Sequence, residues 1–204
     1  MTLESSKTLG GVGALLVVIG CLGFFGSGYA GLLILIGAIL TLIGLKGLAD
    51  HYNEGGIFNN ALYGVIMVII GVVVFMAIFV AMVIMTVLPN LDWTNSLAIQ
   101  QYFMDLNNLW NIIGTVIIAL VGLFVFFVIA AIFFRKSLTA LSTKSGEKIF
   151  ETAGLLWLIG AVLTIVFVGV ILIWIAWILI AVGFFSIKTT VAQPPVAPPS
   201  PPPS

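Results

Sequence analysis

Long apolar stretches, separated by short polar segments, make up most of this 204-residue chain. A helix needs about 20 apolar residues to cross the hydrocarbon core of a bilayer. Glycine-, proline- or charge-containing segments separate the apolar stretches, as expected for turns between helices. The pattern therefore predicts an all-α, polytopic membrane protein with six transmembrane helices. Their expected ranges are about 9–25, 29–48, 61–88, 109–134, 153–168 and 170–187.

The last apolar stretch, Ala153 to Ile187, is too long for one span. As a single helix it would extend roughly 50 Å, against a hydrocarbon thickness of ~30 Å. Two shorter helices that fold back near Gly169 fit the bilayer better. They also return Lys188 to the side of the membrane that holds the other basic residues.

A short internal similarity supports the pairing of the helices into hairpins. Residues 56–61, Gly-Ile-Phe-Asn-Asn-Ala, lead into the third predicted span, and residues 148–153, Lys-Ile-Phe-Glu-Thr-Ala, lead into the fifth. Each segment follows a polar, glutamate-bearing loop on the same side of the membrane. We therefore expect a six-helix transmembrane bundle built from three tandem helical hairpins.

The distribution of charge predicts how the bundle is oriented. Only 7% of the residues are charged and 62% are hydrophobic, which is too apolar for a water-soluble surface. With six spans, every Lys and Arg falls on the side of the N-terminus, and the positive-inside rule makes that side cytoplasmic. We therefore expect a multi-pass protein of the cell membrane with both termini in the cytoplasm. The basic residues are Lys7, Lys46, Arg135, Lys136, Lys144, Lys148 and Lys188.

Residues 1–188 form the predicted transmembrane domain, and the composition changes abruptly after them. All prolines except Pro89 lie in residues 189–204. Such a segment cannot bury enough apolar surface to join a core. We expect a disordered, proline-rich cytoplasmic tail, which together with the inner loops could bind a cytoplasmic protein. The net charge of zero provides no basic face for nucleic acid.

Glycines recur at intervals of seven residues, two helical turns, along three of the predicted spans. In lipid, small residues allow helix backbones to approach closely and to gain dispersion contacts. We therefore expect these glycines to lie at helix–helix interfaces; the alternative is a glycine-lined pore or substrate cleft. The pairs are Gly13 and Gly20, Gly37 and Gly44, and Gly64 and Gly71.

Acid–base chemistry is confined to the loops, because the predicted spans contain no Asp, Glu, Lys, Arg or His between their ends. Proton relays and most ion-coupled carriers keep such groups within the membrane, so coupled transport is disfavoured. The two inner loops concentrate the ionisable groups, and we expect them to lie side by side as an interaction surface. Its residues are Asp50, His51, Tyr52, Glu54, Glu147 and Glu151.

That surface has little catalytic chemistry. His51 next to Asp50 could act as an acid–base pair or a pH sensor, but a solvated loop anchored by Tyr52 at the headgroups is the simpler interpretation. No Ser or Cys nucleophile at an evident spacing, no second histidine and no phosphate-binding glycine loop accompanies the pair. Glu147 and Glu151 are expected to form ion pairs with the nearby Lys144 and Lys148. We therefore expect no enzymatic activity, no cofactor and no metal.

The outer loop carries its own pattern. Thr94, Asn95 or Ser96 could cap a short surface helix. Its apolar stripe would contain Ile99, Phe103, Leu106 and Trp110. Trp93, Tyr102 and Trp110 are suited to the headgroup layer.

Three segments resemble a known family. They are Leu-Glu-Ser-Ser-Lys-Thr-Leu-Gly-Gly at 3–11, Ile-Phe-Asn-Asn-Ala-Leu-Tyr-Gly at 57–64 and Ala-Val-Gly-Phe-Phe-Ser-Ile at 181–187. They are similar to an archaeal and bacterial membrane-protein family catalogued as domain of unknown function nine-nine-six. The resemblance covers roughly residues 1–188. It implies a polytopic membrane protein and brings no activity, ligand or catalytic residue with it.

Three functional hypotheses follow. The first is a non-catalytic membrane scaffold or interaction protein, whose inner loops and tail bind partners. The second is a channel or small-solute carrier without charged residues in the membrane, and the third is an enzyme acting near His51 and Glu54. A solid, glycine-packed bundle would favour the first, whereas a water-filled cavity reaching mid-membrane would favour the second.

Overall fold

The computed structural model describes residues 1–23, 29–166 and 168–188, and every regular element within these ranges is a helix. The predicted tail, 189–204, and the predicted turn at 26–28 lie outside them. The elements are α1 (Leu3–Gly23), α2 (Ala30–His51), α3 (Gly55–Met82), the π-helical η1 (Val83–Val87), the 3₁₀ turn η2 (Leu88–Asn90), α4 (Ser96–Met104), α5 (Leu106–Ser145), α6 (Ile149–Leu163), the 3₁₀ turn η3 (Thr164–Val166) and α7 (Val168–Ser186).

Six helices of the described chain are long and apolar enough to cross a membrane, which confirms the predicted all-α fold. They differ in length. α1, α2, α6 with η3, and α7 have 21, 22, 18 and 19 residues, so each extends about 30 Å. The continuous run of α3, η1 and η2 has 36 residues and α5 has 40, so these reach roughly 55 to 60 Å.

Several helices continue past the ends of the apolar stretches that predicted them. α5 begins at Leu106, where the Asp105 carboxylate accepts a hydrogen bond from the Asn107 amide (2.8 Å). It ends only at Ser145, where Gly146 adopts a left-handed conformation with φ 77°. Hydropathy marks the part of a helix that lies in lipid, whereas caps and glycine C-termini determine where the helix itself ends.

The expected outer-loop helix is divided in two. Asn95 caps α4, and its side chain accepts hydrogen bonds from the amides of Leu97 and Ala98. The helix then stops at Met104, because Asp105 is extended and starts α5, so the expected four-residue stripe is split between two helices. Tyr102 is buried within the protein and donates a hydrogen bond to the Thr86 carbonyl (3.0 Å). This bond holds α4 against the end of the α3 run.

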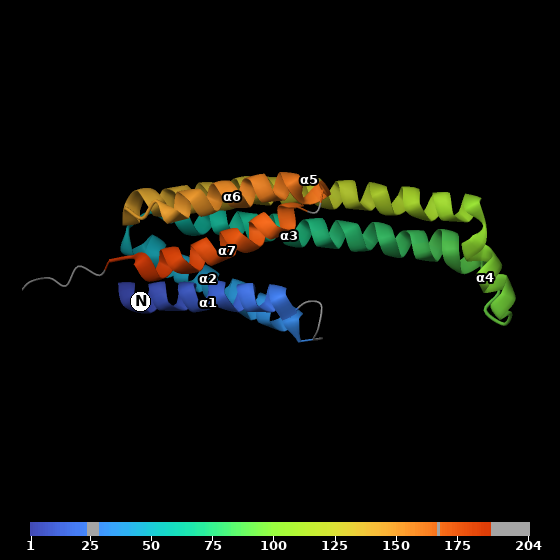
Figure 1. The fold of residues 1–204 in the computed structure, drawn as a ribbon, viewed down its shortest axis with the longest axis horizontal. Helices are drawn as coiled ribbons and strands as arrows, with labels where there is room; N and C mark the ends of the chain where they lie inside the picture. Colours follow the sequence, from blue (N-terminus) through green and yellow to red (C-terminus); the bar gives the residue numbers. More distant parts are fainter. Residues whose placement is uncertain (24–28, 167, 189–204) are drawn as a thin grey trace, which may run out of the picture.

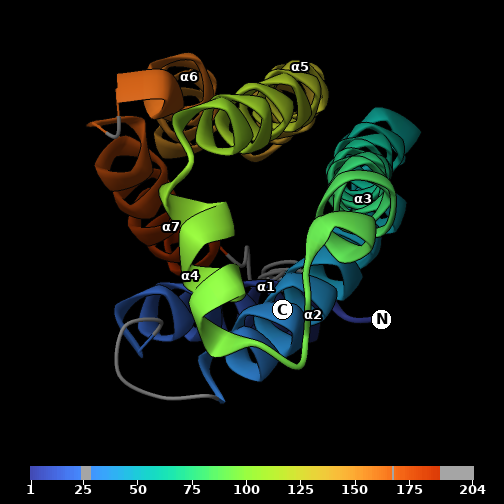
Figure 2. The same cartoon turned by 90° about the vertical axis from the view of Figure 1, so that its right-hand side faces the viewer.

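The helices pair as three tandem hairpins, α1 with α2, α3 with α5, and α6 with α7, as predicted. The end view shows the hairpins arranged as a ring, with α2 next to α3, α5 next to α6, and α7 next to α1 (Figure 2). The contact between α2 and α3 is the least extensive of those that close the ring.

The N-terminus, the α2–α3 and α5–α6 loops and the end of α7 lie together at one end of the ring (Figure 1). We call it the basic end, because every Lys and Arg lies in or near these segments of the sequence. The largest buried side chains gather there: Leu48, Ile57, Leu141, Phe150 and Phe184 are almost fully inaccessible. Phe150, in the first turn of α6, belongs to this core, and its aromatic ring packs edge-on against the ring of Phe184. The Phe150 side chain thus fixes the start of α6 by packing in the interior of the ring of helices.

Hydrogen bonds between different helices also stabilise the basic end. The Ser137 hydroxyl of α5 donates to the Ile57 carbonyl of α3 (2.5 Å), and both residues are buried. Lys7 of α1 donates to the Ile187 carbonyl just after α7 (3.2 Å). Each bond joins segments far apart in the sequence, so the basic end is held by tertiary contacts as well as by hairpins.

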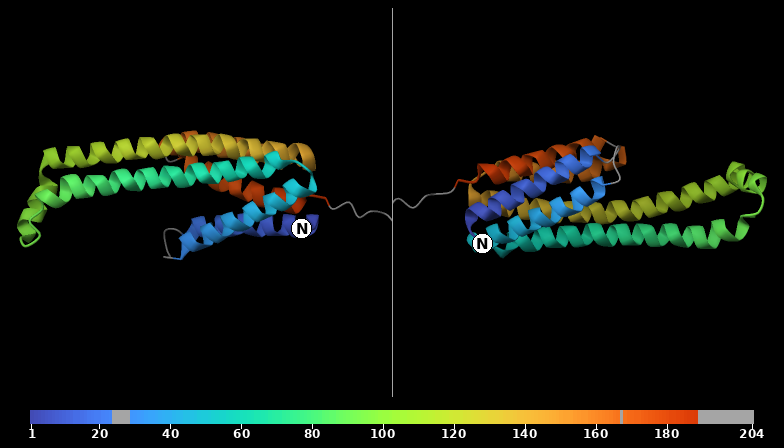
Figure 3. Two further views of the ribbon diagram at one scale, coloured as in Figure 1. Left: turned by 180° about the vertical axis from the view of Figure 1, so that it is seen from behind. Right: turned by 90° about the horizontal axis from the view of Figure 1, so that it is seen from below.

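At the opposite end, the α3–α5 hairpin continues far beyond the other four helices (Figures 1 and 3). We call residues 72–122, which include α4 at the tip, the arm. Its two long helices contact each other, and their remaining surface is apolar and exposed. Examples of its exposed side chains are Val73, Met76, Met85, Leu106, Trp110 and Ile118.

Candidate functional site

The loops at the basic end lie against each other. The Lys144 ammonium is 3.3 Å from a carboxylate oxygen of Glu54, and this ion pair joins the end of α5 to the loop between α2 and α3. Burial raises the pKa of the Tyr52 hydroxyl, and the nearby negative charge of Glu147 raises it further. The structure thus brings Tyr52, Glu54 and Glu147 together from two loops that are distant in sequence.

The remaining residues of the expected surface are exposed. The Asp50 carboxylate lies 3.4 Å from the Lys46 ammonium, one helical turn earlier. The His51 ring lies edge-on to Tyr52, with ring centres 5.1 Å apart. Glu151 is exposed in the first turn of α6. In the described chain no three His, Cys, Asp or Glu side chains are close enough to hold a metal ion.

One local expectation was wrong. Glu147 and Glu151 were expected to pair with Lys144 and Lys148, three residues away, but Lys144 instead pairs with Glu54 of the other loop. Both loops are short and turn through one left-handed residue, Asn53 with φ 49° and Gly146. The tight turns bring the loops within reach of each other, and sequence spacing alone does not reveal a contact of that kind.

Helix–helix contacts account for all six predicted glycines. A Cβ atom at Gly13 would lie 2.6 Å from the Gly37 carbonyl oxygen, and one at Gly37 would lie 2.6 Å from the Gly13 carbonyl oxygen. Gly20 and Gly44 face the partner helix of the same α1–α2 hairpin. In the α3–α5 hairpin, Gly64 faces Phe134 and Gly71 faces Phe126. Glycine therefore permits the close approach in both hairpins.

Sequence spacing missed the corresponding contact in the third hairpin. A Cβ atom at Gly160 of α6 would lie 3.0 Å from the Gly169 carbonyl oxygen of α7, and Gly169 likewise faces the backbone of Gly160. The two glycines lie on different helices on either side of the turn, so no seven-residue repeat marks them. The sequence placed the turn at Gly169, whereas α7 already begins at Val168, so Gly169 was not expected to lie on a helix facing Gly160.

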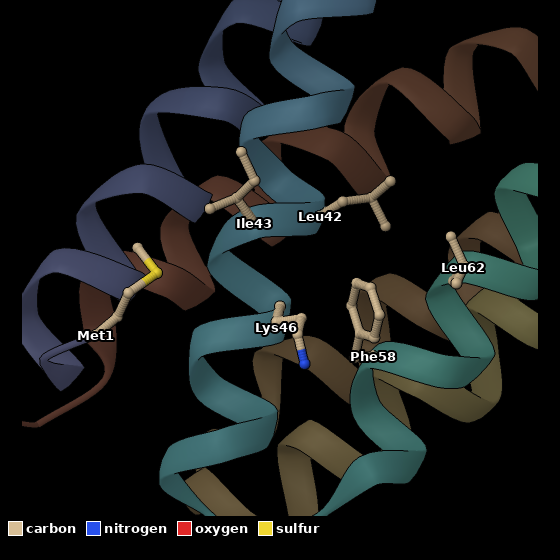
Figure 4. A pocket seen from close by; sticks show the side chains of 6 residues that line it. All are labelled: Met1, Leu42, Ile43, Lys46, Phe58 and Leu62. Carbon is tan, nitrogen blue, oxygen red and sulfur yellow. The ribbon is translucent and has the colours of Figure 1, made fainter.

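An apolar cleft separates α2 from α3 near the basic end (Figure 4). Its volume is about 280 Å³. At the edge of the cleft, the Lys46 ammonium lies 5.0 Å from the centre of the Phe58 aromatic ring. Lys46 and Phe58 were not predicted to meet, because they belong to different hairpins. The cleft is lined by Met1, Leu42, Ile43, Lys46, Phe58 and Leu62.

The interior of the ring is much tighter. Four helices surround a cavity of about 20 Å³, which has room for about one water molecule. The rings of Phe134 and Trp157, whose centres are 4.9 Å apart, fill much of this region. The cavity is lined by Thr41, Leu45, Phe134, Ser137, Leu138, Trp157, Trp177 and Ile180.

Together these features define an all-α membrane protein with a packed ring of hairpins, a charged surface at one end and an apolar arm at the other. The chain belongs to the family described as "Protein of unknown function (DUF996)", whose model matches residues 33–178. It is similar to an uncharacterized protein of Methanocaldococcus jannaschii, with 32% identity over 191 residues, 92% of this chain and 94% of the relative. No solved structure matches the chain.

Proposed function

We propose that this protein is a non-catalytic scaffold or interaction protein of the cell membrane, and that the arm is the element that contacts other membrane proteins. The arm carries the proposal, since two long apolar helices leave the ring and, apart from the short α4 at the tip, gain no further helical neighbour within the described chain. Exposed apolar surface alone would only indicate lipid contact. The small residues on the arm give a more specific indication.

Most glycines of the ring helices face a neighbouring helix, with Gly31 near the start of α2 as an exception, whereas two glycines on the arm do not. A Cβ atom at Gly114 or Gly122 of α5 would meet no atom of the described residues within 4 Å. Ala77 and Ala81 of α3 are exposed and lie one turn apart, the small-xxx-small spacing that allows close helix contact. These positions leave room for the backbone of another helix, so a partner transmembrane helix fits the arm well.

The tight interior supports a scaffold over the alternative of a channel or small-solute carrier. A conducting pathway needs a polar or hydrated route through the bundle. The cavity described above is only about 20 Å³, and aromatic side chains occupy its surroundings.

The proposed orientation places the basic end and both termini in the cytoplasm, in line with the positive-inside rule. The joined loops, with Tyr52, Glu54, Lys144 and Glu147, would then form a cytoplasmic surface for a soluble protein partner. The proline-rich segment at 189–204 follows the same end of the bundle in sequence and is suited to contribute to such a contact.

Photo-crosslinking in native membranes tests the role of the arm. A photoreactive amino acid is introduced at Ala77 or Gly114 on the arm and, as a matched control, at Ile36, an exposed apolar position of α2 in the ring. We expect protein adducts from the two arm positions and only lipid adducts from Ile36. An adduct of twice the monomer mass would identify the partner as a second copy. Lipid adducts alone at all three positions would refute the proposed contact.

A further inference from the structure

We propose that the cleft between α2 and α3 binds one acyl chain of an anionic phospholipid from the leaflet at the basic end, with Lys46 contacting the phosphate. This site is separate from the arm, so it does not depend on the proposed protein contact. The proposal rests on the shape of the cleft, its lining and the charge at its edge.

The cleft lies between α2 and α3, whose mutual contact is the least extensive of those that close the ring. Within the α1–α2 and α3–α5 hairpins, glycines bring the backbones together. Between α2 and α3, Leu42, Phe58 and Leu62 line an open space of about 280 Å³ instead. Apolar cavities exclude water and accept apolar guests. In a bilayer, the apolar guest available beside such a space is an acyl chain.

A cation at the mouth of the cleft gives it amphipathic character. The stem of Lys46 lines the apolar space, while its ammonium lies 5.0 Å from the Phe58 ring centre (Figure 4). A lysine that buries its stem and keeps its charge at the polar boundary is typical of the headgroup layer. A phospholipid has the same arrangement, an apolar chain below a charged phosphate, and therefore matches the cleft in both chemistry and direction.

The acidic groups nearby leave the Lys46 ammonium available. Asp50 lies 3.4 Å from it, but both side chains are more than half exposed, so the pair is weak in water and a phosphate can share or replace it. Glu54, the next acidic residue along the chain, is paired with Lys144. The imidazole of His51 is exposed and faces Tyr52. Basic residues outnumber acidic ones at this end, which favours an anionic headgroup over a zwitterionic one.

Native mass spectrometry of the purified, delipidated full-length chain tests whether the charge of Lys46 contributes to lipid binding. The probes are dioleoylphosphatidylglycerol and dioleoylphosphatidylcholine, which carry the same chains and differ in net charge. Lys46→Gln should weaken phosphatidylglycerol binding roughly tenfold, the effect of losing one charge-assisted contact. Lys136→Gln is the matched control, because its ammonium also lies over an aromatic ring, Phe133 (5.8 Å), but lines no part of the cleft. Its phosphatidylglycerol binding should equal that of the parent chain.

A second pair of variants tests the cleft itself. Ile43→Trp places a bulky ring at an exposed position of the lining and should abolish the tightly bound lipid. Ile39→Trp, one turn earlier, exposed and outside the lining, should leave it bound. Equal losses in the two lysine variants, or in the two tryptophan variants, would overturn the proposal. So would equal binding of the two lipids, or competition by inorganic phosphate as strong as that by the lipid.

Discussion

The ring and the arm are both built from apolar helices, yet they use small residues in opposite ways. In the ring, glycines face a neighbouring backbone: Gly13 and Gly37 would each place a Cβ atom 2.6 Å from the carbonyl of the other. On the arm, Gly114 and Gly122 face open space. The comparison suggests that the ring is complete within one chain, whereas the arm has an unused contact surface.

The α3–α5 hairpin belongs to both regions, which shows that helix type alone does not decide the difference. Near the basic end, Gly64 and Gly71 of α3 contact Phe134 and Phe126 of α5. Beyond them the same two helices continue without the neighbours that complete the ring. The short helices, at about 30 Å, match a hydrocarbon core, and the hairpin exceeds it, so tilt or a partner must accommodate the excess length.

The largest effect is expected where the ring is tightest. Gly37→Leu forces a side chain against the backbone of α1 and should destabilise the fold by about 3 kcal/mol or more. Gly31→Leu on the same helix is the matched control, since a Cβ atom there meets no atom of the described part of the chain within 4 Å. Thermal unfolding in lipid nanodiscs should show a large drop in Tm for the first variant only. Equal Tm values would mean that the α1–α2 contact contributes little.

A leucine substituted for a glycine on the arm should leave stability unchanged and weaken the contact with partner proteins. Gly114→Leu fills open space, so thermal stability should stay within about 0.5 kcal/mol of the parent, as for ordinary surface substitutions. Protein adducts from a photoreactive residue at Ala77 should decrease, because the added bulk blocks close helix approach. If Gly114→Leu lowers the Tm markedly, or leaves the yield of protein adducts unchanged, the distinction between the ring and the arm is contradicted.

The sequence predicted the ring better than it predicted the surfaces. Hydropathy and the basic residues identified six helices and three hairpins, because lipid imposes a length and a composition on each span. Two-turn glycine spacing located helix contacts in two hairpins. The Gly160–Gly169 contact, the Lys144–Glu54 pair and the cleft edged by Lys46 were missed, since each joins residues on different helices or loops.

The projection of the arm could not be predicted from hydropathy either. The ranges predicted for the third and fourth spans, 61–88 and 109–134, already exceed the length that a ~30 Å hydrocarbon core requires. How far the hairpin extends past the ring depends on where its two long helices end at the tip: the α3 run ends at Asn90, and Asp105 caps the start of α5. Residues in polar segments decide the helix ends through hydrogen bonds that an apolar pattern does not encode.

A smaller loss of stability is expected when the buried hydrogen bond between α5 and α3 is removed. Ser137→Ala removes the hydroxyl that donates to the Ile57 carbonyl and should cost about 1 kcal/mol. Thr143→Ala, which removes an exposed bond to the Thr139 carbonyl within one helix, should cost close to nothing. Denaturant or thermal unfolding that ranks the two variants in the opposite order would argue against a tertiary role for Ser137.

The smallest predicted effect concerns the tip of the arm. Hydrogen bonds from the Thr94 hydroxyl and amide hold the pKa of Asp92 below its usual value. A depressed folded-state pKa stabilises the fold above the unfolded pKa, and this contribution is lost as pH falls through the folded pKa. Thr94→Val removes the hydroxyl bond, so the pKa of Asp92 should rise. A carboxyl-carbon NMR titration checks this, and an unchanged Asp92 titration would show that the hydroxyl bond is absent in solution.

Accessibility of the two ends of the long hairpin tests the account most directly, because the arm tip and the basic end must lie on opposite sides of the membrane. In a Cys21→Ala background, single cysteines replace Ser96 on α4 and Thr143 near the end of α5, both exposed; Ser142, one residue earlier, is buried and unsuitable. With a membrane-impermeant thiol reagent, we expect labelling of Ser96→Cys in intact cells and of Thr143→Cys only after permeabilisation. Labelling of Thr143→Cys in intact cells would contradict a hairpin that crosses the membrane with its basic end in the cytoplasm.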